Sequence, residues 1–313
     1  MISDSPIVRG RLAPSPTGRM HVGHARSFLL AWWSARSQFG ELALRIEDLD
    51  RLRAREEWRE GILEDLRWLG IDWDGEVELQ SEHLEATLAA ASKLLLGGHL
   101  YPCICSRSDV RDAVNAPHGD GLLSNGEVNY PGTCRGRFRS IEEAEQVAGR
   151  SATLRFQVPD EPVVVVDAVC GTRSFSLRDY GGDFVAMRRD AQPAYQLGVV
   201  VEDARLGVTE VLRGDDLLVS AARQQLIQGA LGLATPRWLH VPLVHGVLGE
   251  RLEKRAGSTS LAELRSNGML ASDLIAWVAR SVGMEPLPKA SAQAYLPQFS
   301  LDKLPKDVAI WGC

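Results

Sequence analysis

The sequence contains no long hydrophobic run. Its first residues, MISDSPIVRGRLAP, include no apolar stretch of the length that a secretory leader needs. No later segment approaches the roughly 20 apolar residues of a membrane-spanning helix. We therefore expect neither export nor membrane insertion, and we expect the chain to act in the cytoplasm.

An excess of positive charge is also missing. The 35 Lys and Arg residues are outnumbered by 41 Asp and Glu residues, and the formal net charge is -6. Indiscriminate binding to nucleic acid needs a broadly basic face, so this class of function is excluded, whereas a local basic patch could still hold RNA. Five arginines are candidates for such a patch, or else belong to an ordinary solvated surface: Arg135, Arg137, Arg139, Arg188 and Arg189.

Cysteine is scarce and clustered. Three of the five cysteines, Cys103, Cys105 and Cys134, lie near one another in the sequence, while Cys170 and Cys313 stand alone. Disulfides are rare in cytoplasmic proteins and thiolates bind metal ions well, so the cluster indicates a metal site. We expect the two lone cysteines to be small buried or terminal residues.

The sequence shows neither internal repeats nor low-complexity tracts. Its 313 residues, 45% hydrophobic and 24% charged, suit one large globular domain or two smaller ones. The opening pattern predicts a strand at 6–13, a turn at 14–18, a helix at 22–39 capped by Gly40, and a buried strand at 42–46. Such an order begins a parallel α/β sheet, in which ligands bind beyond the carboxyl ends of the strands. The turn and Glu47 should therefore border one crevice.

The remaining chain divides by composition. The hydrophobic pattern predicts helices at 54–69, 81–97 and 216–231, and strands at 163–167, 207–214 and 238–244. We expect four segments: residues 1–100 as the first half of an α/β catalytic domain, 101–190 as an insertion rich in cysteine, proline and glycine, 191–260 as the second half of the catalytic domain, and 261–313 as a small cap of two or three helices.

A short histidine motif follows the first turn. His21, Gly23 and His24 stand at the predicted start of a helix, where unpaired N–H groups and the helix dipole attract phosphate. Two imidazoles there could donate hydrogen bonds to phosphate oxygens, and Gly23 would let a nucleotide approach the backbone. The alternative is a pair of solvent-facing histidines.

Ordered motifs give this segment a wider meaning. The stretches are RLAPSPTGRMHVGHAR (11–26), LRIEDLD (44–50), LEDLRWLGIDWD (63–74), QSEHLE (80–85), LYPCICS (100–106) and AYQLGVVVEDARLGVTEVLRGDDLL (194–218). Together they resemble the glutamyl- and glutaminyl-tRNA synthetases over most of residues 7–255. The resemblance implies the Rossmann-like parallel nucleotide-binding domain of class I synthetases, with a zinc-bearing insertion and a small helical cap.

The resemblance also implies an ATP site. The loop RLEKR (251–255) is similar to the family's KMSKS loop, with Lys254 on the second lysine and with Glu253 and Arg255 in place of serines. His21, His24 and Lys254 would then be catalytic, and these three with Gly23 would bind ATP together with Mg²⁺. An exposed charged loop is the alternative.

A glutamate pocket follows from the same resemblance. Arg11 and Arg213 would meet the two carboxylates and Glu47 would face the ammonium group, because buried charges need partners. Tyr195 would donate its hydroxyl, and Ala13 and Ser15 would line the turn. Otherwise Glu47 would cap a helix, Tyr195 would be a core aromatic residue and Arg213 would form a surface ion pair.

The cysteine cluster is similar to the structural zinc site in the family's acceptor-binding insertion. By this resemblance the ligands are Cys103, Cys105, Tyr130 and Cys134. Ordinary zinc chemistry would nominate His118 as the fourth ligand in place of Tyr130.

The end of the sequence favours one branch of the family. Only 58 residues follow Arg255 (313 minus 255), and Leu217 stands where the longer enzymes carry histidine. Both features resemble a truncated branch that makes glutamyl-adenylate without tRNA and transfers glutamate to queuosine in the anticodon loop of tRNA(Asp). We expect a monomer. The alternatives are a minimal enzyme charging the 3′ end of tRNA(Glu) and an inactive RNA-binding paralogue.

Overall fold

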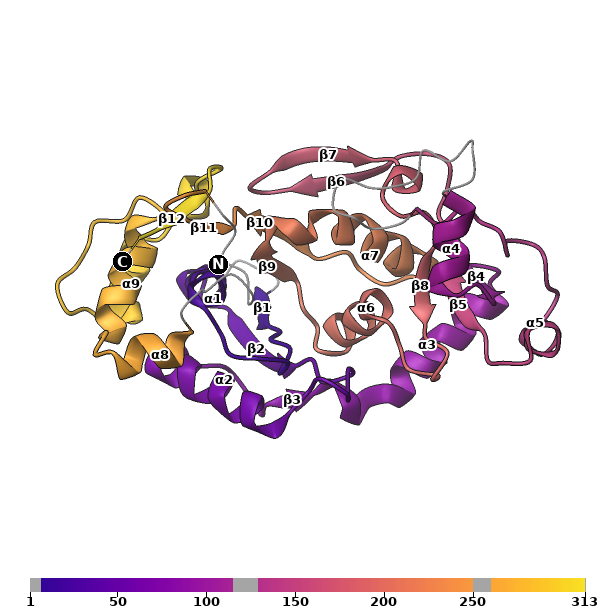
Figure 1. The fold of residues 1–313 in the computed structure, drawn as a ribbon. Coiled ribbons are helices and arrows are strands. Elements are labelled where there is room, and N and C mark those ends of the chain that lie inside the picture. The colour runs from indigo at the N-terminus through magenta and orange to yellow at the C-terminus, as the bar shows by residue number, and fades with distance from the viewer. Residues whose placement is uncertain (1–6, 115–128, 250–259, 313) are drawn as a thin grey trace.

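The computed structural model describes residues 7–114, 129–249 and 260–312. Figure 1 shows the C-terminal segment at one end of the molecule, a small antiparallel sheet at the other end, and the parallel strands between them. His118, Cys313 and the loop that carries Lys254 lie outside the described residues.

The chain begins with three parallel strands. Strands β1 (Arg9–Leu12), β2 (Glu41–Ile46) and β3 (Glu78–Leu79) pair in that order. Helix α1 (Val22–Ser37) connects β1 to β2, as the crossover helix between two parallel strands usually does. Both strands are almost entirely buried, as parallel strands covered on two faces should be.

A second sheet continues beside β1. Its order is β7 (Gly171–Phe175), β6 (Val163–Asp167), β10 (Arg237–Val241) and β9 (Glu210–Gly214), with only the β6–β7 pair antiparallel. The Thr209 N–H donates to the Arg9 carbonyl at 2.9 Å, which holds the start of β9 next to β1. The predicted parallel α/β fold is therefore confirmed.

Helices and a small antiparallel sheet complete the fold. The sheet has the order β4 (Leu100–Cys103), β5 (Thr153–Phe156) and β8 (Phe184–Met187). The helices between the strands are α2 (Glu56–Trp68), α3 (Leu84–Leu96), α4 (Arg107–Val114), α5 (Ile141–Ala148), α6 (Tyr195–Arg205) and α7 (Leu218–Leu231). None of the helices in the described ranges is both long enough and apolar enough to cross a membrane.

Two local predictions need correction. Helix α1 ends at Ser37 and the left-handed residue after it is Phe39, with φ 54°, so Gly40 is not its cap. Gly40 is required for another reason: a Cβ atom there would lie 2.4 Å from the Val8 carbonyl oxygen. The strand predicted at 238–244 breaks at Pro242, which has no N–H to donate, and resumes as β11 (Val244–Gly246).

The C-terminal stretch is less helical than predicted. Helices α8 (Leu261–Ser266) and α9 (Ala271–Arg280) are followed by short 3₁₀ turns and by strand β12 (Ala309–Trp311), which pairs with β11. A strand of three residues is too short for its pattern to be recognised in a sequence.

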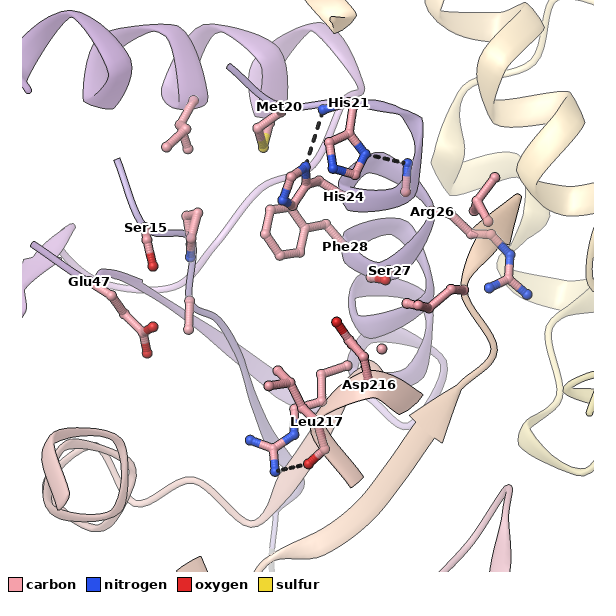
Figure 2. Close-up of a pocket in the computed structure, with 18 of the residues that line it drawn as sticks. Ser15, Met20, His21, His24, Arg26, Ser27, Phe28, Glu47, Asp216 and Leu217 are labelled. Carbon is pink, nitrogen blue, oxygen red and sulfur yellow. Dashed lines mark hydrogen bonds between the residues drawn. The ribbon is translucent and has the colours of Figure 1, made fainter. Parts of the chain in front are cut away.

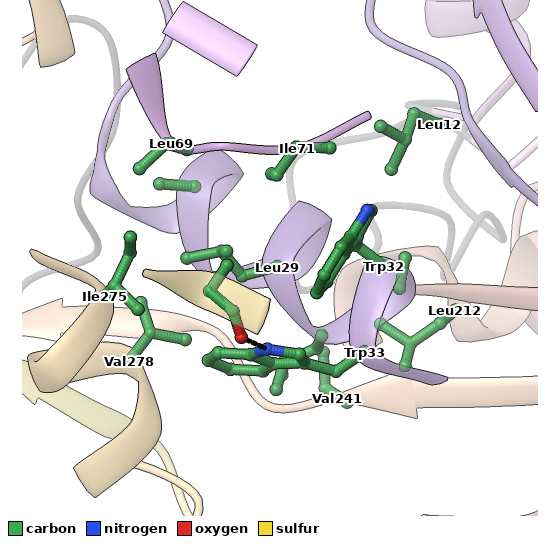
Figure 3. Close-up of a cluster of buried hydrophobic side chains, with 14 of the residues drawn as sticks. Leu12, Leu29, Trp32, Trp33, Leu69, Ile71, Leu212, Val241, Ile275 and Val278 are labelled. Atoms are coloured by element: carbon green, nitrogen blue, oxygen red, sulfur yellow. Dashed lines mark hydrogen bonds between the residues drawn. The ribbon is translucent and has the colours of Figure 1, made fainter. Parts of the chain in front are cut away.

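The main core lies between the first sheet and the C-terminal helices. Trp33 of α1 is fully buried, and its indole N–H donates to the Ala292 carbonyl at 2.8 Å. Figure 3 shows Trp33 lying between Val241 of β10 and the α9 residues Ile275 and Val278. Helix α1 is thus covered on both sides, which holds its N-terminus in place at the edge of the sheet.

Asp65 gives the fold a specific pH dependence. It lies on α2 with 3% of its surface exposed, and Arg265 of α8 is 3.4 Å from its Oδ1. Burial raises the pKa of Asp65 from 3.8 to about 6, because the arginine only partly compensates for lost solvation. The folded chain thus binds this proton more tightly than the unfolded chain, and stability falls as the pH rises from about 4 to about 6.

We therefore expect Asp65→Asn to stabilise the protein more at pH 7.5 than at pH 4, by at most about 3 kcal/mol. Urea unfolding at both pH values measures the difference. Glu64→Gln, which alters the exposed partner of the same arginine, is the matched control. An equal effect of Asp65→Asn at both pH values would contradict this assignment.

Candidate active site

One cavity of about 710 Å³ lies where strands β1, β2, β9 and β10 end. In Figure 2, Ser15, Glu47, His24, Asp216 and Leu217 surround its open space. Every predicted glutamate- or nucleotide-binding residue within the described ranges lines it: Arg11, Ala13, Ser15, His21, Gly23, His24, Glu47, Tyr195 and Arg213.

The two histidines cap helix α1 with their own rings. The Gly23 N–H donates to Nδ1 of His21, and the His21 N–H donates to Nδ1 of His24, both at 3.2 Å. An Nδ1 that accepts a hydrogen bond places the neutral ring's proton on Nε2, so each imidazole is set up as a donor through Nε2. A Cβ atom on Gly23 would lie 3.0 Å from the His21 ring, so glycine at this position also leaves room for the ring.

A buried ion-pair network lies behind one wall of the cavity, which its members Arg11 and Glu47 line. Arg45 lies 2.5 Å from Asp203 and 3.0 Å from Glu47, and Asp203 also lies 3.7 Å from Arg11. Burial alone would lower the pKa of Arg45, but the two carboxylates raise it overall. The network holds two arginines and two acids, so it is electrically balanced. Glu47 contacts Arg45 rather than capping a helix.

Arg213 is held differently, by neutral groups. Only 5% of its surface is exposed, so it is not a surface residue. Its Nε donates to Nε2 of His240 at 3.0 Å, and its Nη2 donates to Oε1 of Gln224 at 3.0 Å and to the Leu217 carbonyl at 3.3 Å. Among the described residues, no acceptor binds its Nη1 and no carboxylate pairs with it. Burial is the main cause that lowers the pKa of Arg213, and Arg11 adds to it against the opposing effects of Tyr195, Asp203 and Glu47.

Tyr195 is the first residue of helix α6 and faces the cavity. It is 40% exposed, so the alternative of a core aromatic residue does not hold. Desolvation raises the pKa of the Tyr195 hydroxyl, which keeps it protonated and able to donate at neutral pH.

Sequence reasoning missed the residues that support this wall. Arg45 could have been found, because it lies in β2 two positions before Glu47, and side chains two positions apart in an extended chain point the same way. Asp203, Gln224, His240 and Asp167 come from other elements, and no local pattern links them to the cavity residues.

The cysteine cluster is assembled where strand β4 ends, at Cys103. The sulfur atoms of Cys103, Cys105 and Cys134 all lie within 4.8 Å of one another, and the Tyr130 hydroxyl is 3.4 Å from the Cys103 sulfur. In a tetrahedral zinc site with Zn–S bonds of about 2.3 Å, neighbouring sulfur atoms would be about 3.8 Å apart. The three thiols therefore fit a zinc ion, and the Tyr130 oxygen is close enough to complete the set.

The electrostatics of the cluster agree with a cation site. Burial, together with the neighbouring Cys103 and Cys134, raises the pKa of Cys105 to about 12. Three thiolates so close together repel one another, and a divalent cation relieves that repulsion. Despite burial, the Tyr130 hydroxyl and Arg155, whose Nε donates to the Cys103 sulfur at 3.3 Å, lower the pKa of Cys103 and so favour the thiolate that a metal ion binds.

The candidate basic patch is largely used within the fold. Arg135 pairs with Asp183, and Arg188 pairs with Asp190 at 2.8 Å. Arg189 donates to the carbonyl of Cys105 at 2.7 Å and so supports the cysteine loop. Arg137 and Arg139 are the exposed members of the group.

Known proteins resemble this chain along nearly its whole length. The catalytic-domain profile described as tRNA synthetases class I (E and Q) matches residues 7–294. A glutamyl-Q tRNA(Asp) synthetase from Symbiobacterium thermophilum is 42% identical over 307 residues, which cover 95% of this chain and 94% of that protein. A glutamate–tRNA ligase from Hydrogenobaculum is 37% identical over 296 residues, which cover 92% of this chain and 62% of that protein.

A solved structure supports the same relationship. The glutamate-tRNA synthetase of Elizabethkingia anophelis superposes with a TM-score of 0.82 at 25% identity, covering 98% of this chain and 68% of that one. The chain belongs to the class I tRNA synthetase family of the glutamyl and glutaminyl enzymes.

Proposed function

We propose that this chain is a ligase that activates L-glutamate with ATP to glutamyl-adenylate without tRNA, and then transfers the glutamate to queuosine at the wobble position of tRNA(Asp). The observation that carries the proposal is the buried charge of Arg213, which no carboxylate of the described residues contacts, in a cavity that also contains the His21–His24 helix cap. One end of the cavity then suits a carboxylate and the other suits phosphate.

Glutamate fits the charges of the wall. Its two carboxylates and one ammonium group carry a net charge of −1 at neutral pH, which would neutralise Arg213 beside the balanced network. Arg213 would bind one carboxylate through Nη1, and Arg11 would bind the other. Arg45 donates to Oε1 of Glu47, so Glu47 would accept a hydrogen bond from the ammonium group through its other oxygen, Oε2. Tyr195 would donate its hydroxyl, with Ala13 and Ser15 lining the turn.

Activation would need placement rather than a general base. The α-carboxylate is already ionised at neutral pH, and its oxygen would attack the α-phosphorus while the bond to the β-phosphate breaks and pyrophosphate leaves. His21 and His24 would donate to phosphate oxygens through Nε2, beside the backbone of Gly23. Lys254 would add charge at the α-phosphate, on the strength of its place in the KMSKS-like loop. Bound Mg²⁺ would neutralise further phosphate charge.

The organisation of the chain supports a family-like arrangement. Residues 1–100 and 191–260 would form the catalytic domain, 101–190 the insertion with structural zinc on Cys103, Cys105, Tyr130 and Cys134, and 261–313 the small cap. ATP and tRNA as substrates suggest a reaction in the cytoplasm, and we propose a monomer as the active form.

The identity of the acceptor rests on the comparisons. The glutamyl-Q tRNA(Asp) synthetase of Symbiobacterium aligns over 94% of its length, against 62% for the Hydrogenobaculum ligase. Unstacked bases of a single-stranded anticodon loop are suited to recognition in such a cavity. Charging the 3′ end of tRNA(Glu) is the competing outcome.

The function can be tested with purified protein and tRNA isolated from cells with and without queuosine, by measuring the transfer of labelled glutamate to the tRNA. We expect glutamate-dependent pyrophosphate exchange without tRNA, and labelling of queuosine-containing tRNA(Asp) that survives trimming of the 3′ end. Labelling that trimming removes would assign the protein to tRNA(Glu) charging. Absence of exchange in folded, zinc-loaded protein would indicate an inactive paralogue.

Arg213→Gln should raise the KM for glutamate roughly 100-fold while the KM for ATP changes little, because about 3 kcal/mol of charge-assisted binding is lost. Pyrophosphate exchange measures both constants. Arg178→Gln, in an exposed ion pair with Asp160, is the control that should behave like the wild type. Equal increases in both KM values would count against a glutamate-specific role.

Zinc binding can be tested residue by residue. We expect about one zinc ion per chain, and Tyr130→Phe should weaken its retention against a chelator because only the hydroxyl is lost. His118→Ala should leave retention unchanged. Colorimetric chelator competition measures release, and the reverse pattern would make His118 the fourth ligand.

A further inference from the structure

His240 lies directly behind Arg213. The two residues face each other across the parallel pair β9–β10, and His240 is fully buried. Its Nε2 accepts the hydrogen bond from Arg213 Nε at 3.0 Å, so this nitrogen must carry a lone pair rather than a proton.

Asp167 determines which nitrogen is protonated. Its Oδ2 lies 2.6 Å from Nδ1 of His240 and also accepts the His240 backbone N–H at 3.1 Å. Its Oδ1 accepts the N–H groups of Val169 and Cys170 at 2.9 and 2.8 Å. A carboxylate that only accepts can bind Nδ1 only as N–H, which leaves Nε2 free of its proton for Arg213.

The arrangement positions Arg213 without neutralising it. Its Nε and Nη2 donate to a neutral imidazole, an amide and a backbone carbonyl, while Nη1 has no acceptor among the described residues. A protonated His240 would turn an acceptor into a donor and set a second cation against Arg213 and Arg11. Burial is the main cause that lowers the pKa of His240, with these two arginines adding to it against the opposing effect of Asp167.

We propose that His240, held in one tautomer by Asp167, is a positioning residue that orients Arg213 toward the substrate carboxylate and leaves its charge for that carboxylate. The inference rests on the proposed function, because it assumes that Arg213 binds glutamate. Asp167 belongs to β6, so a strand from within residues 101–190 helps to set the geometry of the cavity.

A matched pair of variants separates the two hydrogen bonds of His240. His240→Gln keeps an acceptor near the position of Nε2, whereas His240→Asn keeps a donor near Nδ1 and loses the acceptor for Arg213. We expect His240→Asn to raise the KM for glutamate about 10- to 100-fold, with kcat and the KM for ATP within about threefold of the wild type. His240→Gln should have a KM for glutamate within about fivefold of the wild-type value.

A second pair tests the need for a neutral acceptor and covers the case in which His240→Asn does not fold. His240→Glu has the length of His240→Gln but adds a carboxylate beside Arg213, which would pair with the guanidinium and compete with the substrate. We expect its KM for glutamate to exceed that of His240→Gln about 100-fold or more, at a similar melting temperature.

The outcomes separate this inference from the proposed function. If the wild type shows no glutamate-dependent exchange, the proposed function fails. If the wild type is active and His240→Asn keeps its KM for glutamate, or loses kcat and both KM values alike, the positioning role is overturned. Equal KM values for His240→Glu and His240→Gln would overturn the requirement for a neutral acceptor.

Discussion

The buried charge of Arg213 constrains this site. A guanidinium removed from water without a partner is costly, and Arg213 is kept there by acceptors that hold it in place but carry no charge. The neighbouring arginines are treated in the opposite way, since Arg11 and Arg45 are matched by Asp203 and Glu47. The difference between the two arrangements leaves the charge of Arg213 for an anionic ligand.

The sheet is what brings these groups together. Parallel strands end at one edge, so β1, β2 and β9 deliver Arg11, Glu47 and Arg213 to the same cavity. The buried packing of α1 around Trp33 holds the histidine-capped N-terminus of that helix beside them. The β6 strand then adds Asp167 from a segment that sequence composition alone separates from the catalytic domain.

Much of this could be predicted from local pattern. The order of strand, turn and helix placed Glu47 and the turn at 14–18 around one crevice, because each follows a strand that its own sequence defines. The pair His240–Asp167 could not be predicted, because its members lie 73 positions apart in the sequence and are brought together only by the order of the strands. Strand β12 was not predicted because three residues are too few to show a pattern. Gly40 was predicted as a helix cap, because the close approach of the Val8 carbonyl that requires glycine there cannot be recognised in a sequence.

The central claim is that Arg213, which no carboxylate of the described residues contacts, offers its charge to a substrate carboxylate. Calorimetric titration with glutamate and its two mono-amides, glutamine and isoglutamine, tests it most directly. The account predicts that the amide replacing the carboxylate opposite Arg213 binds at least about 100-fold more weakly than glutamate. Equal affinities for all three ligands would contradict it.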